Sequence, residues 1–298
     1  MLCGSLSVPL YKLKGLDKPP ATESSVGVDV ITKRKKIQTA NVLAFVLAMV
    51  VNGTSNSFSR NTQAEIAEEW DVRIMPAGWA FSIWGVIYLF LVTFVAYQAL
   101  PANSVKERSN VLILDRIGMT FVLNMLANAL WLVCFGFNTP LAFFIALLDI
   151  IALLATGVKI MMLASRAELT KFERFIIGGG FTLYNGWVSA ATILNVSFFL
   201  KSCGLGKDQE WETGVTCSVL VVGWFVYLFV AFTEMNPLFG LVYIWPLLAI
   251  RGRQKDYGDV ATTCLVIIIA DAIAMISLMQ YCRSEAKKSR LDVSIESN

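Results

Sequence analysis

Apolar residues along this chain gather into runs of about twenty, and short polar segments separate the runs. A helix rises about 1.5 Å per residue, so a run of about twenty residues crosses roughly 30 Å of hydrocarbon. One further apolar stretch, 237–250, is shorter: it has only 14 residues and contains Pro246. It would make about 21 Å of helix and is expected to be short, tilted, re-entrant or broken. The full-length runs predict membrane helices near 39–58, 77–99, 115–136, 139–164, 174–199, 214–233 and 257–282.

The composition strengthens this prediction. Of the 298 residues, 56% are apolar and 16% are charged, and the mean hydropathy is +0.62. That is too little polar side chain to cover a soluble globule of this size. We therefore predict an all-α fold, a polytopic membrane helix bundle in contact with the lipid bilayer. The net charge of only +3 argues against a nucleic-acid partner.

The basic residues predict which end of the bundle faces the cytoplasm. Residues 1–38 are predicted to be a disordered cytoplasmic tail and residues 283–298 a polar C-terminal tail. The basic run 33–36, just before the first helix, should stay on the cytoplasmic side. Tracing eight spans from that start places 18 Lys and Arg inside and 7 outside. If 237–250 re-entered the membrane, Arg251, Arg253 and Lys255 would move inside and the C-terminus outside.

Three aromatic-rich motifs stand out within the apolar runs. In the first, a Pro-x-x-Trp-x-Phe sequence is followed by Trp84 and Tyr88, which are four residues apart, so their side chains share one stripe of a helix. The second reads Leu-Ala-Asn-Ala-Leu-Trp over residues 126–131. The third reads Trp-Val-Ser-Ala-Ala-Thr-Ile-Leu-Asn over residues 187–195.

In their order and spacing these motifs resemble those of the translocator protein, or tryptophan-rich sensory protein, family (TspO/MBR-related). The resemblance implies a five-helix core over residues 39–200. Residues 201–282 would then add about three membrane segments that the usual family lacks, as in an extended, eukaryotic-style member. A homodimer is also implied, although the added segments could cover the faces through which family members pair.

The resemblance further implies that the motif residues surround one ligand-binding cavity, with Trp70 on a loop that covers its mouth. Flat aromatic walls with a few amide groups suit a large, planar, mostly apolar ligand such as a tetrapyrrole or a sterol. The alternative is that the same aromatic residues only pack helices together or anchor the membrane interface. The predicted ligand-binding residues are Trp79, Phe81, Trp84, Tyr88, Asn128, Trp131, Trp187, Ala191, Asn195 and Trp70.

The chain has no histidine, which removes His-based acid–base catalysis and His ligation of haem or zinc. We therefore expect no catalytic residue, no metal site and no required cofactor, and any porphyrin or haem would bind without His ligation. The predicted function is binding of the hydrophobic molecule, with its transport across the membrane left open. An enzyme that modifies a bound tetrapyrrole stays as an alternative.

Two carboxylates interrupt the apolar runs. Asp149 and Asp271 lie near the middle of predicted membrane helices, where a carboxylate costs about 2.5–3.5 kcal/mol on insertion scales. They predict an alternative function, a proton-coupled transporter of small solutes, in which both acids titrate. The competing interpretation is structural hydrogen bonding, in which the acid is protonated.

Overall fold

A computed structural model describes residues 26–58, 63–100, 104–205 and 209–296, and every regular element in these ranges is helical. The predicted all-α membrane fold is confirmed. Three shorter 3₁₀ or π segments precede or join the α-helices, namely η1 (Gly78–Ser82), η2 (Val111–Ile117) and η3 (Arg174–Gly179). The α-helices are α1 (Val26–Phe58), α2 (Gln63–Trp70), α3 (Ile83–Ala99), α4 (Ser104–Asn110), α5 (Met119–Phe135), α6 (Pro140–Ser165), α7 (Lys171–Glu173), α8 (Gly180–Ser202), α9 (Gln209–Thr233), α10 (Pro237–Arg253) and α11 (Gly258–Glu296).

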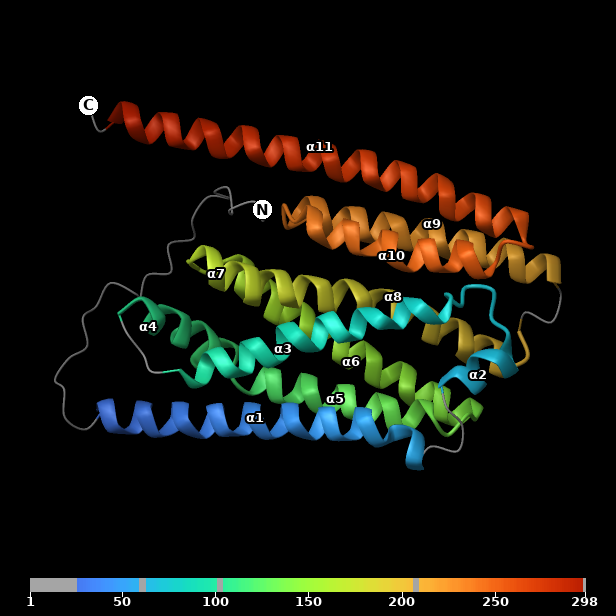
Figure 1. Cartoon of the computed structure of the whole chain (residues 1–298), viewed down its shortest axis with the longest axis horizontal. Coiled ribbons are helices and arrows are strands. Elements are labelled where there is room, and N and C mark those ends of the chain that lie inside the picture. Colours follow the sequence, from blue (N-terminus) through green and yellow to red (C-terminus); the bar gives the residue numbers. More distant parts are fainter. Residues whose placement is uncertain (1–25, 59–62, 101–103, 206–208, 297–298) are drawn as a thin grey trace.

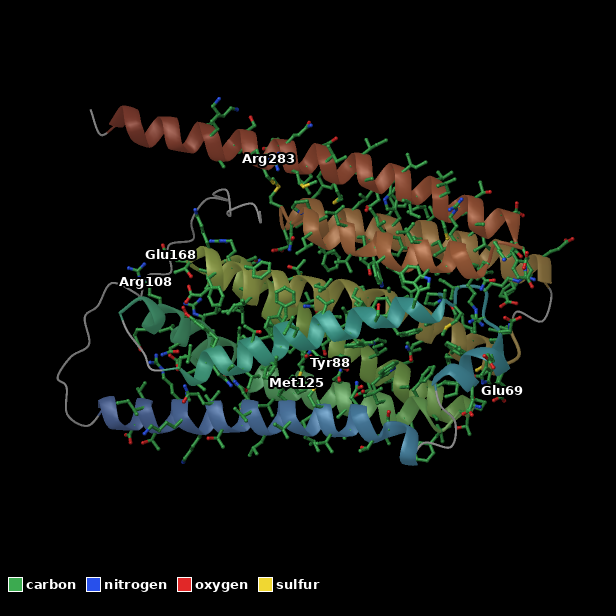
Figure 2. All side chains as sticks on the ribbon, viewed as in Figure 1. Glu69, Tyr88, Arg108, Met125, Glu168 and Arg283 are labelled. Atoms are coloured by element: carbon green, nitrogen blue, oxygen red, sulfur yellow. The ribbon has the colours of Figure 1, made fainter. Side chains whose placement is uncertain are left out.

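The long helices lie side by side along one axis (Figure 1). Helix α1 forms one side of the bundle and α11 the opposite side, with α3, α5, α6 and α8 between α1 and the layer of α9 and α10. Helix α1 begins and α11 ends at the same end of the bundle, where α4 and α7 also lie, and α2 lies at the other end. The side chains of Arg108 and Glu168 mark the first end and Glu69 the second, while Tyr88 and Met125 lie between the helices (Figure 2).

Six helical segments in the described ranges are long and apolar enough to cross a membrane, or seven if a bent pair counts as one span. The bent pair replaces the predicted helix 115–136: a 58° bend separates the segment ending at Ile117 from α5. Gly118 makes this bend with φ +42°, a conformation that disfavours residues with a Cβ. A Cβ there would also lie 2.9 Å from the carbonyl oxygen of Leu114.

Helix α10 runs through the bundle between its neighbours and does not turn back. At its start, Asn236 donates a hydrogen bond to Thr182 of α8 at 2.8 Å. At its other end, the carbonyl of Ala249 accepts from the backbone N–H of Ala77 at 3.1 Å, next to the start of η1. Its 17 residues continue past Pro246 and make about 26 Å of helix. The segment therefore does not fold back on itself, and Arg251 and Arg253 lie at the same end as α2, although its 17 residues leave α10 outside the six segments that are long enough to cross a membrane.

Two helices extend further than the apolar pattern predicts. Residues 26–38 belong to α1, although a disordered tail was predicted there, and residues 1–25 lie outside the described ranges. Arg34 explains part of this extension, because its guanidinium binds Glu107 of α4 and lies 2.6 Å from Asp115 of η2. Helix α11 likewise continues to Glu296, through most of the predicted C-terminal tail.

Candidate functional site

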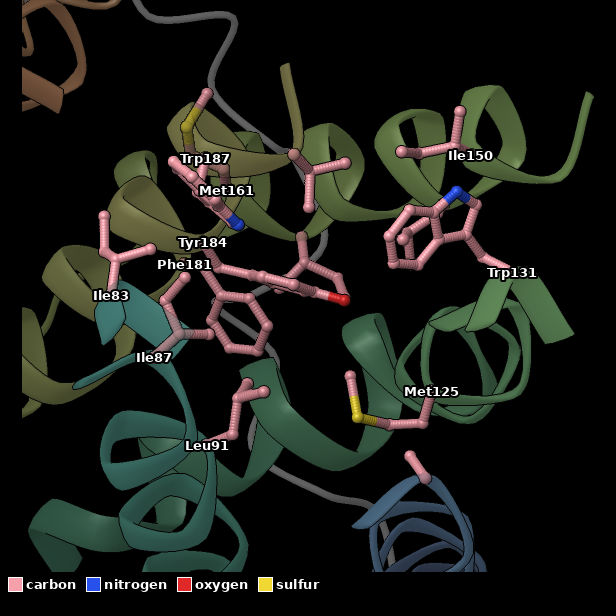
Figure 3. Packing of buried hydrophobic residues seen from close by; sticks show 14 of the residues in the cluster. Ile83, Ile87, Leu91, Met125, Trp131, Ile150, Met161, Phe181, Tyr184 and Trp187 are labelled. Carbon is pink, nitrogen blue, oxygen red and sulfur yellow. The ribbon is translucent and has the colours of Figure 1, made fainter. Parts of the chain in front are cut away.

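The stripe of the first motif faces α8. The ring of Trp84 stacks on Tyr88 with centroids 5.3 Å apart and meets the edges of Tyr184 at 6.1 Å and Trp187 at 6.5 Å. Phe81, in η1, also contacts Trp187 edge to face, at 5.7 Å. Figure 3 shows Tyr184 and Trp187 of α8 close to each other, with the Tyr184 hydroxyl in the interior between the helices and Trp131 of α5 pointing into the same interior. The first and third motifs therefore form one aromatic cluster.

A cavity of about 50 Å³ lies beside this cluster. Its walls come from the 74–76 segment, η1, α3, α5, α8, α9 and α10, and they are almost entirely apolar. The lining residues are Ile74, Met75, Pro76, Phe81, Trp84, Trp131, Phe135, Trp187, Ala190, Ala191, Ile193, Leu194, Asn195, Phe198, Leu220, Tyr243, Pro246 and Ile250. Six predicted ligand-binding residues are among them: Phe81, Trp84, Trp131, Trp187, Ala191 and Asn195.

Few polar groups face this cavity. The indole N–H of Trp131 donates to the side-chain oxygen of Asn195 at 3.0 Å, which joins the second motif to the third. The Asn195 amide nitrogen in turn donates to the carbonyl of Ala191 at 2.8 Å. The indole nitrogen of Trp187 is buried and makes no hydrogen bond within the described ranges. The site can thus enclose an apolar molecule and has one spare hydrogen-bond donor.

The other four predicted residues do not line the cavity. Trp79 is 48% exposed and packs edge to face on Trp245 of α10 at 4.9 Å. Tyr88 accepts a hydrogen bond from Asn52 of α1. Trp79 thus contacts α10, and Tyr88, which stacks on Trp84, also contacts α1.

Asn128 and Trp70 also point elsewhere. Asn128 donates to the hydroxyl of Tyr184 at 3.3 Å, behind the aromatic cluster. Trp70, at the end of α2, donates to Asn138 at 2.6 Å and contacts the edge of Phe143 at 5.6 Å. The chain segment that does line the cavity is the one following α2, at residues 74–76.

Sequence reasoning missed the wall formed by α9 and α10. Leu220, Tyr243, Pro246 and Ile250 lie in helices that the motifs do not reach, and no pattern in those helices marks them as cavity residues. Phe135 could have been found, because it lies four residues after Trp131 and so shares its helix face. The added segments therefore complete the pocket as well as extending the bundle.

Neither intramembrane acid belongs to the cavity wall. Asp271 of α11 is fully buried, and one carboxylate oxygen accepts from the indole N–H of Trp224 in α9 at 3.2 Å. Asp149 of α6 is half-buried. Within the described ranges, the second carboxylate oxygen of each acid is buried and has no hydrogen-bond partner.

This fold and site define a polytopic membrane protein with an aromatic cavity between its helices. The TSPO-like protein family matches residues 38–277, and the chain belongs to that family. The match extends through α9, α10 and the first half of α11, so it includes most of the segments predicted to be additions to a five-helix core. No curated protein and no solved structure matches the chain. The predicted family resemblance is confirmed.

Proposed function

We propose that this protein binds a flat, mostly apolar molecule, a tetrapyrrole or a sterol, in the aromatic cavity and holds or moves it within the membrane. The observation that carries the proposal is the meeting of Phe81, Trp84, Trp131 and Trp187, from different helices, at one apolar cavity. Edge-to-face aromatic walls supply area for burial and ring stacking. The spare N–H of Trp187 can orient a ligand.

The size of the cavity sets a condition on this function. An apolar cavity that holds one benzene molecule has a volume of about 150 Å³, whereas this cavity has about 50 Å³. A tetrapyrrole or a sterol is much larger than benzene. Binding therefore requires the walls to part. The motif helices α3, α5 and α8 form one part of the wall, and residues 74–76 with α10 lie among the parts that the motifs do not include.

Filling the cavity should abolish binding. Ala191 is a small residue on the cavity wall, and Ala191→Phe would place a ring in the space that the ligand needs. We expect the affinity for protoporphyrin IX to fall at least about 100-fold, since overpacking also opposes the opening of the walls. The measurement is a titration of the detergent-purified protein, followed through the fluorescence of the porphyrin itself, so that all tryptophans stay in place.

Val196→Phe is the matched control, because Val196 lies on the same helix and is 37% exposed. It adds the same ring on the outer surface and should bind protoporphyrin IX as the unchanged chain does. Equal loss in both variants, or equal binding, would show that the aromatic cluster only packs helices. A steady decay of porphyrin absorbance after binding would instead indicate the enzyme alternative.

A second function, proton-coupled transport, is favoured by one specific observation: Asp271 is fully buried, and among the described residues its carboxylate has a single hydrogen-bond donor, the indole of Trp224. If this acid carries protons, Asp271→Asn should abolish proton uptake into liposomes containing the protein, measured with an internal pH-sensitive dye. Trp84→Ala should leave that uptake unchanged. Uptake that survives Asp271→Asn would rule out this role for the acid.

A further inference from the structure

A row of polar side chains lies behind the aromatic cluster, between α5, α6 and α8. Asn124 and Asn128 lie one turn apart on α5, and Asp149 and Thr156 lie on α6. Tyr184 of α8 joins them, and its hydroxyl lies in the interior between the helices (Figure 3). We call these five residues the polar seam. None of them lines the aromatic cavity.

The packing of α5 on α6 sets which members of the polar seam lie opposite each other. The side-chain nitrogen of Asn124 donates to the carbonyl of Leu153 and to the hydroxyl of Thr156, each at 2.9 Å. Because the two helices are antiparallel, one turn further along α5 corresponds to one turn back along α6. Asn128, one turn after Asn124, therefore lies beside Asp149.

Two other contacts support this placement. The rings of Phe135 and Phe143 lie 5.2 Å apart, which continues the same register toward the end of α5. Asp149 also lies close enough to Tyr184 for its charge to act on the hydroxyl. That hydroxyl accepts from the side-chain nitrogen of Asn128 at 3.3 Å. The carboxylate and the second asparagine of α5 thus share one partner on α8.

Three oxygen atoms of the polar seam are buried and receive no hydrogen bond from the described part of the chain. They are the side-chain oxygens of Asn124 and Asn128 and one carboxylate oxygen of Asp149. Asn124 is fully buried, and Asn128 is 2% exposed. Lys159, the basic residue of α6, is exposed and lies ten residues from Asp149, about 15 Å along the helix. A negative charge and two amide oxygens without donors are costly in a membrane interior.

We propose that the polar seam binds a monovalent cation, Na⁺, through oxygen atoms of Asp149, Asn128 and Asn124. Carboxylate and amide oxygens suit a hard cation, and this set lies outside the histidine chemistry that the sequence excludes. One carboxylate balances one positive charge, whereas a divalent ion would leave an uncompensated charge in the membrane.

The competing occupants satisfy fewer of these groups. A proton neutralises Asp149 but leaves both amide oxygens without a partner, and a water molecule leaves the negative charge. The close packing of α5 on α6 favours Na⁺ over the larger K⁺. The ion ties α5 to α6 beside Tyr184, whose ring lies 6.1 Å from that of Trp84.

The first test compares the thermal unfolding midpoint of the detergent-purified full chain in sodium chloride and in choline chloride, at equal ionic strength and pH. A ligand that binds only the folded state stabilises it in proportion to the logarithm of its concentration above Kd. Sodium chloride at about 100 mM should therefore raise the midpoint by at least about 3 °C, and potassium chloride should raise it less. An equal midpoint in all of these salts would overturn the site.

Asp149→Asn keeps the shape of the side chain and removes its charge. This variant should lose the rise caused by sodium. Its midpoint in choline chloride should equal or exceed that of the unchanged chain, because a charge without a partner is no longer buried. Asp271→Asn is the matched control, since it makes the same change at the other intramembrane acid and should keep the rise. A rise that persists in Asp149→Asn, or that both variants lose, would overturn the site.

A direct binding measurement keeps the proposal testable if Asp149→Asn fails to fold. Radioactive sodium in equilibrium dialysis should bind to the unchanged chain, and unlabelled Na⁺ but not choline should displace it. Asn128→Leu removes one amide oxygen at similar volume and should weaken this binding at least about tenfold, since even groups that only support metal ligands matter by about 10–100-fold. No bound sodium, with a midpoint that responds to pH alone, would identify a proton at Asp149 and overturn the site. Neither measurement uses a porphyrin, so the result does not depend on the proposed function.

Discussion

Gly157→Val should lower the stability of the whole bundle by roughly 2–4 kcal/mol, as a sum of overpacking and a lost buried hydrogen bond. Gly157 lies at the contact of α6 with α8, and a Cβ there would stand 2.1 Å from the side-chain oxygen of Asn185. Asn185 is almost fully buried and donates to the carbonyl of Gly157 at 2.9 Å and to that of Phe181 at 2.8 Å. Small residues at such contacts let membrane helices approach closely. The measurement is the thermal unfolding midpoint in detergent.

The matched control is Gly85→Val on α3. A Cβ at Gly85 meets nothing within 4 Å, and the position is exposed. This variant should unfold within a few degrees of the unchanged chain, because valine in place of glycine costs little or nothing in helix propensity. A midpoint for Gly157→Val as high as that of Gly85→Val would mean that α6 and α8 are not packed as closely as described.

The apolar runs predicted the helices well because a membrane span imposes one simple requirement, about twenty apolar residues. The errors lie where other forces decide. Helix α1 extends back to Val26 because charged contacts of Arg34 with α4 and η2 stabilise its polar part, which hydropathy alone reads as a tail. The predicted helix 115–136 is bent because Gly118 adopts a positive φ, and a single glycine in an apolar run gives no sign of its conformation.

Helix α10 shows the limit of length as a criterion. Its predicted length was 14 residues, and the helix is 17 residues long, because Pro246 does not end it and the polar Arg251 and Arg253 complete its last turn. Proline removes one backbone donor from a helix. The neighbouring helices α8, α9 and α11 pack around α10 and keep it continuous. Tertiary packing of this kind cannot be predicted from one segment alone.

The candidate site was predictable as far as the motifs reached. Trp131 and Asn195, 64 residues apart, do meet, as expected if the second and third motifs face one interior. Trp79 was assigned to the pocket because it belongs to the first motif, and Trp70 because it belongs to the loop expected to cover the cavity. A helix can turn an aromatic residue either toward the cavity or toward a neighbouring helix. Trp79 turns to Trp245 of α10, a helix that the motifs do not include.

Gly186→Ala is expected to loosen the contact between α8 and α10 and to lower stability by roughly 1–3 kcal/mol, the usual cost of an overpacked interior. A Cβ at Gly186 would stand 2.7–3.1 Å from the Cγ1, Cβ and Cγ2 atoms of Val242, so the Val242 side chain occupies the space that a methyl group would need. The carbonyl of Gly186 also accepts a hydrogen bond from the hydroxyl of Tyr227 in α9. One residue thus holds both added helices against the helix that carries the third motif.

Val242→Ala supplies the test of this mechanism, because it removes two of the three atoms that the new methyl group would meet. The double variant should recover part of the thermal midpoint lost in Gly186→Ala, although Val242→Ala alone lowers it. If the added helices and the motif helices form one folding unit, Gly186→Ala unfolds in a single thermal transition at a lower temperature than the unchanged chain. Two separate transitions in Gly186→Ala would show instead that α9–α11 unfold independently, and the cavity wall they supply would then be able to part from α8 without unfolding the rest.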